Sequence, residues 1–281
     1  MKKTFLQMVS LCMVIALLTG CSSDTKNDTK KEIKKESKQS EAPDAKISVT
    51  EGTYDEYLEC IVADGVCYEI KDEAYAAVTG YDGEQENIDI PSTLTYEGKD
   101  YPVEAINDEA FSYNTVLTKL TLPDSLKSIG KEAFCSCSSL VSVEIPDGVT
   151  TLGTGIFYDC TELTSCIIGK GITNLPNEMF TNCYALADIT LPDTLVAIGE
   201  EVFWACENIK QMTLPESVVT MGQRAFYGSG IENFTILAKG VTVTEDMLDG
   251  LDELQTLYID EALVETAKKC VHVDVSVEAL K

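Results

Sequence analysis

Hydrophobic positions recur every 23 residues through the middle of the chain. Six of the eight phenylalanines keep this interval, and they are Phe111, Phe134, Phe157, Phe180, Phe203 and Phe226. Aliphatic residues keep it too, as in Leu122, Ile145, Ile168, Leu191 and Leu214. A period of this length indicates an array whose units are too small to bury their own apolar side chains. Stacking of the units then builds one continuous core.

The residue pattern within each unit predicts a strand followed by a corner and a turn. Val143 and Ile145 alternate with polar residues, as in a strand with one buried face. Pro146 ends that strand because it has no N–H to donate, and Gly153 allows a tight corner. In the preceding unit, residues 131–134 are long enough for one helical or 3₁₀ turn, which would point the phenylalanine into the core.

This pattern resembles the leucine-rich-repeat family, specifically the short bacterial type of BspA-like surface proteins. The matching motifs are Leu120-Thr121-Leu122-Pro123, Leu126-Lys127-Ser128-Ile129-Gly130, Glu132-Ala133-Phe134, Cys137 and Leu140, with their equivalents in later units. The resemblance covers residues 88–259 and implies an α/β, β-rich leucine-rich-repeat solenoid of stacked parallel strands joined by short or helical turns. It also implies an interaction module, with adhesion to proteins of a host or a neighbouring cell as one theme.

Both ends of such an array need caps, because open ends expose sheet edges and core. Residues 66–70 and 76–78 predict a hairpin or meander within an N-terminal cap over 47–87. We expect the first strand of the array at 88–90 and a hairpin excursion at 96–101. A C-terminal cap over 260–281 is predicted to contain a helix at 261–269 and an alternating strand at 271–275.

The first 46 residues have the features of a targeting segment. Lys2 and Lys3 precede a short apolar run ending in Leu18-Thr19-Gly20-Cys21, which resembles the lipobox of bacterial lipoproteins. The resemblance implies a signal peptide over 1–20 and a lipid on Cys21; an ordinary secretory signal is the alternative. Residues 21–46 lack an apolar period and predict a disordered, Lys-rich tether. We therefore expect an extracytoplasmic chain, lipid-anchored to the bacterial cell membrane at the cell surface.

Net charge excludes some classes of partner. The 281 residues carry 47 acidic and 21 basic side chains, a net charge of −26, whereas nucleic acid requires a basic footprint. Residues 1–46 hold nine Lys and six acids, so residues 47–281 hold twelve basic and 41 acidic side chains, a net charge of −29. This charge favours cationic partners and opposes self-association. We expect a monomer that binds no nucleic acid.

Four cysteines keep the 23-residue interval: Cys137, Cys160, Cys183 and Cys206. Equivalent Cα atoms of adjacent coils lie about 5 Å apart, which admits disulfides, and a thiol ladder could also hold a soft metal. The same position is Asn114 at one end of the column and Ser229 at the other. The presence of asparagine and serine at the ends of the column favours an interpretation in which all these residues are small and buried, with their polar groups hydrogen-bonded to the backbone. We predict that the cysteine and phenylalanine columns are structural, with no metal and no cofactor.

Acidic residues form two further columns. Asp124, Asp147, Asp193 and Glu216 follow the strand-ending position, and Glu109, Glu132, Glu178 and Glu201 precede the Ala-Phe step. Stacked carboxylates can attract Ca²⁺, but Lys170 and Arg224 interrupt the two columns and no calcium-loop motif occurs. We expect a solvated face instead.

Outward positions of the predicted sheet form the candidate binding face. One column is Thr121, Glu144, Ile167, Thr190, Thr213, Thr235 and Tyr258, and its neighbour is Lys119, Ser142, Ser165, Asp188, Gln211, Asn233 and Thr256. These residues suit contact with a protein, although Thr is equally a good strand former. The residue after the phenylalanine is aromatic in three units, as Tyr158, Trp204 and Tyr227. Such residues suit an interface, sugar stacking or core filling alike.

No motif in the chain indicates catalysis. It contains no G-x-S-x-G, P-loop or H-E-x-x-H motif, and its single histidine, His272, lies in a predicted strand. We expect no catalytic residues, but a membrane-anchored module that binds an unidentified protein and mediates adhesion at the cell surface. A lipoprotein that binds glycan or cell-wall polymer is the alternative, and a surface enzyme or its accessory subunit is a third class.

Overall fold

The structure is a computed structural model that describes residues 49–81, 83 and 85–280. The predicted signal peptide, the lipidation site Cys21 and the tether lie outside these residues. Among the described residues, no helix has the length and apolar character that crossing a bilayer requires.

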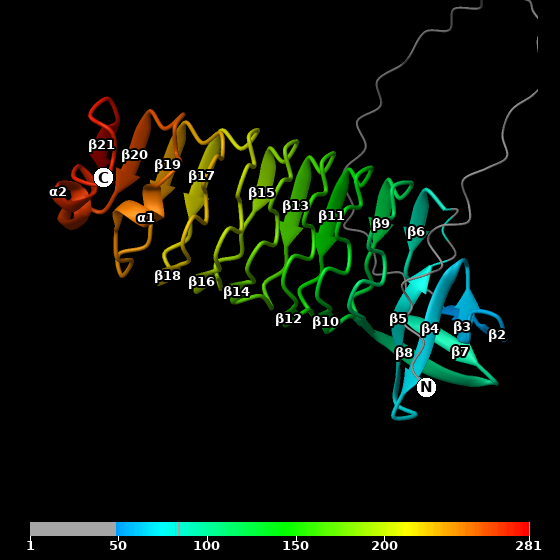
Figure 1. Cartoon of the computed structure of the whole chain (residues 1–281). Coiled ribbons are helices and arrows are strands. Elements are labelled where there is room, and N and C mark those ends of the chain that lie inside the picture. Colours follow the sequence, from blue (N-terminus) through cyan, green and yellow to red (C-terminus); the bar gives the residue numbers. More distant parts are fainter. Residues whose placement is uncertain (1–48, 82, 84, 281) are drawn as a thin grey trace, which may run out of the picture. The chain divides into compact units, whose positions relative to one another are not determined.

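In-register parallel strands form one side of a stack of coils, and we call them the long strands (Figure 1). Five of them pair in the order β15-β13-β11-β9-β6 and four in the order β17-β19-β20-β21. Their bounds are Asn87–Asp89 (β6), Lys119–Thr121 (β9), Ser142–Ile145 (β11), Ser165–Ile168 (β13), Asp188–Thr190 (β15), Gln211–Leu214 (β17), Asn233–Ile236 (β19), Thr256–Ile259 (β20) and Ser276–Ala279 (β21). The observed fold class is therefore the predicted solenoid of stacked parallel strands.

Short two-residue strands lie on the opposite side of the coils (Figure 1). They are Ser128–Ile129 (β10), Thr151–Leu152 (β12), Asn174–Leu175 (β14), Ala197–Ile198 (β16) and Thr220–Met221 (β18). Each is followed by the coil corner, and here Gly153 has a different role from the one predicted. A Cβ on Gly153 would lie 2.3 Å from the backbone N of Lys131 in the preceding coil. The glycine is therefore required for close approach of two coils.

The segment before each phenylalanine is not helical, so the predicted helical or 3₁₀ turn at 131–134 is wrong. Glu132 and Ser136 instead adopt left-handed φ values of 53° and 56°. The N–H groups of Glu132, Phe134 and Ser136 donate to carbonyls of the next coil over 2.9, 2.9 and 2.7 Å. This ladder between coils alternates with bonds within the coil, in which the N–H groups of Cys135 and Cys137 donate to the Glu132 and Phe134 carbonyls over 3.1 and 3.2 Å.

The phenylalanines stack along the centre of the array. Neighbouring rings from Phe111 to Phe226 have centroids 5.2–5.6 Å apart and planes inclined by 8–12°. All six side chains are fully buried. Since each ring covers its neighbours, the stack joins the small units into one core.

At the N-terminal end, a sheet with the order β1-β7-β8-β5-β4-β3-β2 adjoins the coils. The bounds are Val49–Glu51 (β1), Thr53–Asp55 (β2), Cys60–Ala63 (β3), Val66–Lys71 (β4), Tyr75–Tyr81 (β5), Thr93–Tyr96 (β7) and Lys99–Ile106 (β8). β4 and β5 form a hairpin, as do β7 and β8. Because β8 also pairs with β10, this sheet extends past residue 87 and runs into the short strands.

The C-terminal end differs from the prediction in its strand and in the extent of its helices. Glu261–Leu263 (η1) and Val264–Ala267 (α2) begin where a helix was predicted but end two residues earlier. The strand predicted at 271–275 is wrong, because residues 273–274 form a turn and Val273 is fully exposed. The strand is β21, which pairs in parallel with β20 from Ser276 onward. A further short helix, Glu245–Leu248 (α1), was not predicted.

The long strands are interrupted once. β15 and β17 are not paired, although β16 pairs with β18 and the Phe180 and Phe203 rings stack at 5.6 Å. Adjacent coils are thus joined here through the core, the short strands and the turn ladder, in which the Phe203 N–H donates to the Ala225 carbonyl over 2.7 Å. At the two ends, β6 and β21 each have a single partner among the described strands.

Candidate binding surface

Alternation along the long strands separates a buried row from an exposed row. In β11, Val143 and Ile145 are buried whereas Ser142 and Glu144 are exposed. The candidate positions Thr121, Glu144, Ile167, Thr190 and Thr213 are all exposed, and Thr235 and Tyr258 are half-buried. The structure therefore places the whole predicted column on the outward face of the sheet, divided by the gap between β15 and β17.

This row extends by one residue at each end beyond the predicted column. Asp89 pairs in register with Thr121, and Glu278 pairs in register with Tyr258. The alternation around Ile88 and Ile90 could have identified Asp89. Glu278 was missed because the C-terminal strand was placed too early in the chain.

A hollow of about 380 Å³ lies where the outward row meets the strand-ending residues of β11, β13 and β15. It is lined by Glu144, Ile167 and Thr190 of the candidate face and by Asp147 and Lys170 from the ends of the strands. The Lys170 N–H donates to Asp147 Oδ1 over 2.8 Å. The structure thus brings together part of the candidate face and part of one acidic column, which are two separate columns of the repeat.

The three candidate aromatic residues divide into a pair and a single residue. The Trp204 and Tyr227 rings stack with centroids 4.5 Å apart. The Arg224 guanidinium carbon lies 5.8 Å from the Trp204 centroid. A Cβ on Gly250 would lie 2.4 Å from the Tyr227 ring, so backbone covers the ring there. Tyr158 lies two coils from Trp204, and the buried Thr181 occupies the equivalent position between them.

The cysteine column makes a regular set of contacts. The thiols of Cys137, Cys160, Cys183 and Cys206 donate to carbonyls of the preceding coil over 3.1–3.2 Å, and these carbonyls belong to phenylalanines. All four side chains are fully buried. Burial raises the pKa of the Cys137 thiol to about 12 and holds the pKa values of the other three well above 9.0. These groups are therefore neutral thiols at physiological pH.

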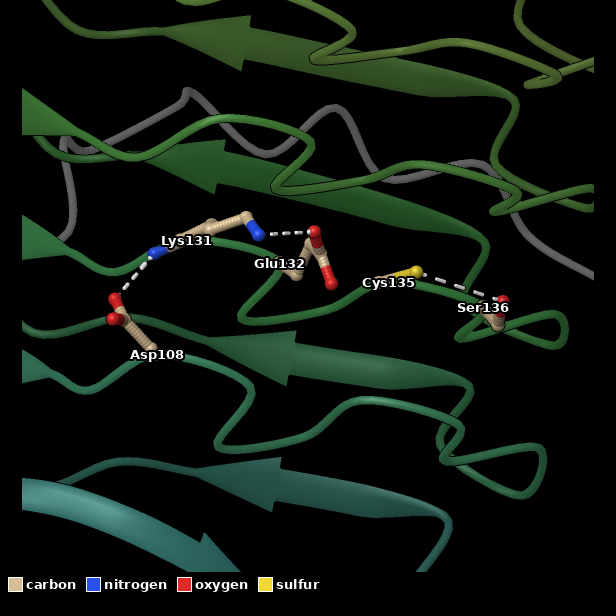
Figure 2. A network of polar contacts seen from close by, with 5 residues as sticks. All are labelled: Asp108, Lys131, Glu132, Cys135 and Ser136. Carbon is tan, nitrogen blue, oxygen red and sulfur yellow. Dashed lines mark hydrogen bonds and ion pairs between the residues drawn. The ribbon is translucent and has the colours of Figure 1, made fainter.

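The second acidic column lies on the turns, and Figure 2 shows one of them. The Lys131 N–H donates to Asp108 Oδ1 over 2.7 Å, and Lys131 Nζ pairs with Glu132 Oε1 at 2.9 Å. Cys135 Sγ lies 3.7 Å from Ser136 Oγ on the same turn. Ion pairs this exposed contribute little to stability. In residues 49–280, apart from positions 82 and 84, no group of three His, Cys, Asp or Glu side chains could hold a metal ion.

A comparison with known protein families identifies the type of these repeats. A family model for the BspA type leucine rich repeat region, built of six copies, matches residues 104–229 and 173–277, which together span more than half of the chain. The chain belongs to this family. The predicted resemblance to BspA-like leucine-rich repeats is thereby confirmed.

Solved structures of leucine-rich-repeat proteins are similar to this BspA-type chain. A leucine rich cell surface protein from Faecalibacterium prausnitzii A2-165 has 19% identity and a TM-score of 0.46, with 78% of this chain and 94% of that chain covered. The leucine-rich repeat protein of T. pallidum has 21% identity and a TM-score of 0.47, with coverage of 75% and 97%. A search of curated proteins found no match.

The single histidine lies near the C-terminal end of the BspA-type repeats. His272 and Cys270 line a hollow of about 320 Å³ beside α1. Burial and the nearby Glu245 raise the pKa of Cys270, which disfavours the thiolate that a nucleophile requires. This pair therefore lacks the activated nucleophile of a cysteine–histidine catalytic site.

Proposed function

We propose that this leucine-rich-repeat chain is an extracytoplasmic binding module that recognises a protein partner and mediates adhesion, with a lipid on Cys21 as its membrane anchor. The observation that supports recognition is the exposed row of the long strands, in which equivalent side chains are held in register from coil to coil. Four of the nine members of this row are threonines, whose side chains are short, so a partner can approach the sheet closely at those positions. A rigid, repeated surface of this kind loses little conformational entropy when it binds.

Binding is tested with the whole chain displayed on cells. Arginine at Thr190 and Thr213 introduces two large side chains on the long-strand face, and we expect loss of adhesion and of the cross-linked protein partner. A matched control places arginine at Thr150 and Thr173, which are exposed at the short strands. Unchanged adhesion of the Thr190→Arg/Thr213→Arg variant would remove the long-strand face from the proposal.

Anchoring is tested separately at Cys21. In cells supplied with a labelled fatty acid, we expect the chain to carry the label and to sediment with membranes. The Cys21→Ser variant is expected to lose both properties. An unlabelled wild-type chain that is released into the medium would favour the ordinary secretory signal and contradict the anchor.

The alternative partner is a glycan or cell-wall polymer bound through the aromatic positions. Sugars stack on open ring faces, but Trp204 covers one face of Tyr227 and the Gly250 backbone lies close against the same ring. This geometry favours a protein partner. Binding on a glycan array that is lost only in Tyr158→Ala or Trp204→Ala variants would instead support the glycan proposal.

A further inference from the structure

The coil that contains β13 differs from its neighbours at three positions that lie close together. The outward residue is Ile167 where the flanking coils have Glu144 and Thr190. The strand-ending residue is Gly169 where the coils of β9, β11, β15 and β17 have proline, and the next residue is Lys170 where those four coils have an acid. The hollow described above is lined by all three of these residues. The repeated sequence pattern is therefore broken at the place where the sheet face is hollowed.

These departures give the hollow an apolar base. Ile167 is 46% exposed, which is unusual for a large aliphatic side chain in an otherwise polar row. Gly169 adds no side chain beside it, and a Cβ there would lie 2.5 Å from the Pro146 carbonyl carbon. An apolar group of a partner can therefore pack on Ile167 from the solvent side.

Charged groups surround this apolar base unevenly. The hollow is lined by four carboxylates, Asp124, Glu144, Asp147 and Asp193, and by one ammonium group, Lys170. All five side chains are exposed. Lys170 takes part in none of the ion pairs formed between described residues. The rim thus has a net negative charge, which attracts basic groups and repels phosphate or other anions.

The spacing of the rim fits an extended chain. Asp124 and Asp193 are three coils apart, which is about 14 Å at the usual distance between neighbouring strands. In an extended peptide, residues i and i+4 are separated by about 13–14 Å and their side chains point the same way. Residue i+2 lies midway between them, between the coils of Glu144 and Ile167 and next to the apolar base.

We propose that this hollow binds an extended polypeptide segment with the pattern basic-x-apolar-x-basic. The two basic side chains pair with the carboxylates at Asp124 and Asp193, and the apolar side chain packs on Ile167. Lys170 then meets a backbone carbonyl or an acidic group of the segment. This inference rests on the proposed function, since it specifies the class of partner and one contact point on the same face.

The test uses the whole purified chain and three immobilised peptides: Lys-Ser-Leu-Ser-Lys, Lys-Ser-Ser-Ser-Lys and Glu-Ser-Leu-Ser-Glu. We expect the first to bind at least tenfold more tightly than the other two. Ile167→Thr, which copies Thr190 of the next coil, should reduce its binding about tenfold, whereas Lys170→Asp should leave it equal or tighter. Thr173→Ala, which is exposed beside the short strands and lies outside both the hollow and the long-strand face, is the matched control and should change nothing.

The outcomes separate this inference from the proposed function. Equal binding of the three peptides, or binding that Ile167→Thr leaves unchanged, would overturn the basic-apolar-basic assignment. If adhesion is nevertheless lost in Thr190→Arg/Thr213→Arg, the proposed function stands without it. Binding of the acidic peptide alone would reverse the charge assignment and overturn the inference. Urea unfolding midpoints equal to that of the wild type establish that the variants are folded.

Discussion

The thiols of the cysteine column show why this buried position favours cysteine over serine. Cys160 Sγ reaches the Phe134 carbonyl over 3.1 Å, and an S–H group needs a hydrogen bond less than a hydroxyl does. Ser229 occupies the same position one coil beyond Cys206, and its Oγ is buried without a hydrogen-bond partner. A hydroxyl at this position therefore incurs a desolvation cost that a thiol largely avoids.

We predict that Cys160→Ser destabilises the fold by about 1–3 kcal/mol, because it buries a hydroxyl with a poorly placed acceptor. Urea unfolding monitored by circular dichroism measures the change. Cys270→Ser is the control, since that side chain is only half-buried and should shift the free energy of unfolding little. A Cys160→Ser protein as stable as the wild type would show that the column accepts hydroxyls.

The same thiols make stability depend on alkaline pH. Burial raises the pKa of Cys137 from 9.0 to about 12, so the folded state keeps a proton that the unfolded state releases. Its stabilising effect is complete below pH 9 and is lost as pH rises from 9 to 12, by about 1.4 kcal/mol per pH unit for each such thiol. We expect the urea midpoint to fall between pH 9 and 11, and to fall less in Cys137→Ala.

At the scale of the element, the turn before each phenylalanine is held in a conformation that its residues do not favour. Left-handed φ values between 53° and 59° occur at Glu109, Glu132, Glu178 and Glu201. The equivalent residue in the turn before Phe157 is Gly155, with a φ of 63°. Left-handed backbone costs a residue with a Cβ about 1–2 kcal/mol. The hydrogen bonds between coils offset that cost.

Replacing one of these glutamates by glycine should therefore stabilise the protein. We predict a gain of about 0.5–1 kcal/mol for Glu178→Gly, since relief of the strained φ exceeds the added entropy of the unfolded chain. Glu207→Gly is the matched control, because Glu207 is exposed and lies outside the left-handed residues. That substitution should destabilise. Thermal unfolding of both variants decides the sign.

These turns also show where sequence-based prediction of elements succeeds and fails. The long strands and the buried phenylalanines followed from the 23-residue period, because a buried face requires it. The turn at 131–134 did not, because Lys-Glu-Ala is a good helical sequence and only contact with the next coil overrides it.

The strand at 276–279 was placed too early because valines alternate from Val271 through Val277. Pairing with β20 selects the correct residues. The hollow is lined by residues of four successive coils, so no single motif indicated it.

At the scale of the whole array, the missing pairing between β15 and β17 divides the long-strand sheet. Stability of a repeat protein depends on contacts between neighbouring units, and this interface lacks the long-strand pairing that β11 makes with both β9 and β13. We predict that amides on the β15-facing edge of β17 exchange with solvent about tenfold faster than the equivalent amides of β11. Native-state hydrogen exchange measures this ratio, and equal protection would contradict a weak interface.

The unpaired outer edges of β6 and β21 determine whether the array can grow. A second copy could extend the ladder by placing its β6 beside β21, since the strands are parallel and in register. That arrangement would set Asp89 of one copy against Glu278 of the next, and like charges opposite one another destabilise strand pairing. Because such head-to-tail contact does not close on itself, it would repeat without limit. Two carboxylates at the ends of one row of side chains would therefore oppose the head-to-tail pairing from which a fibre grows.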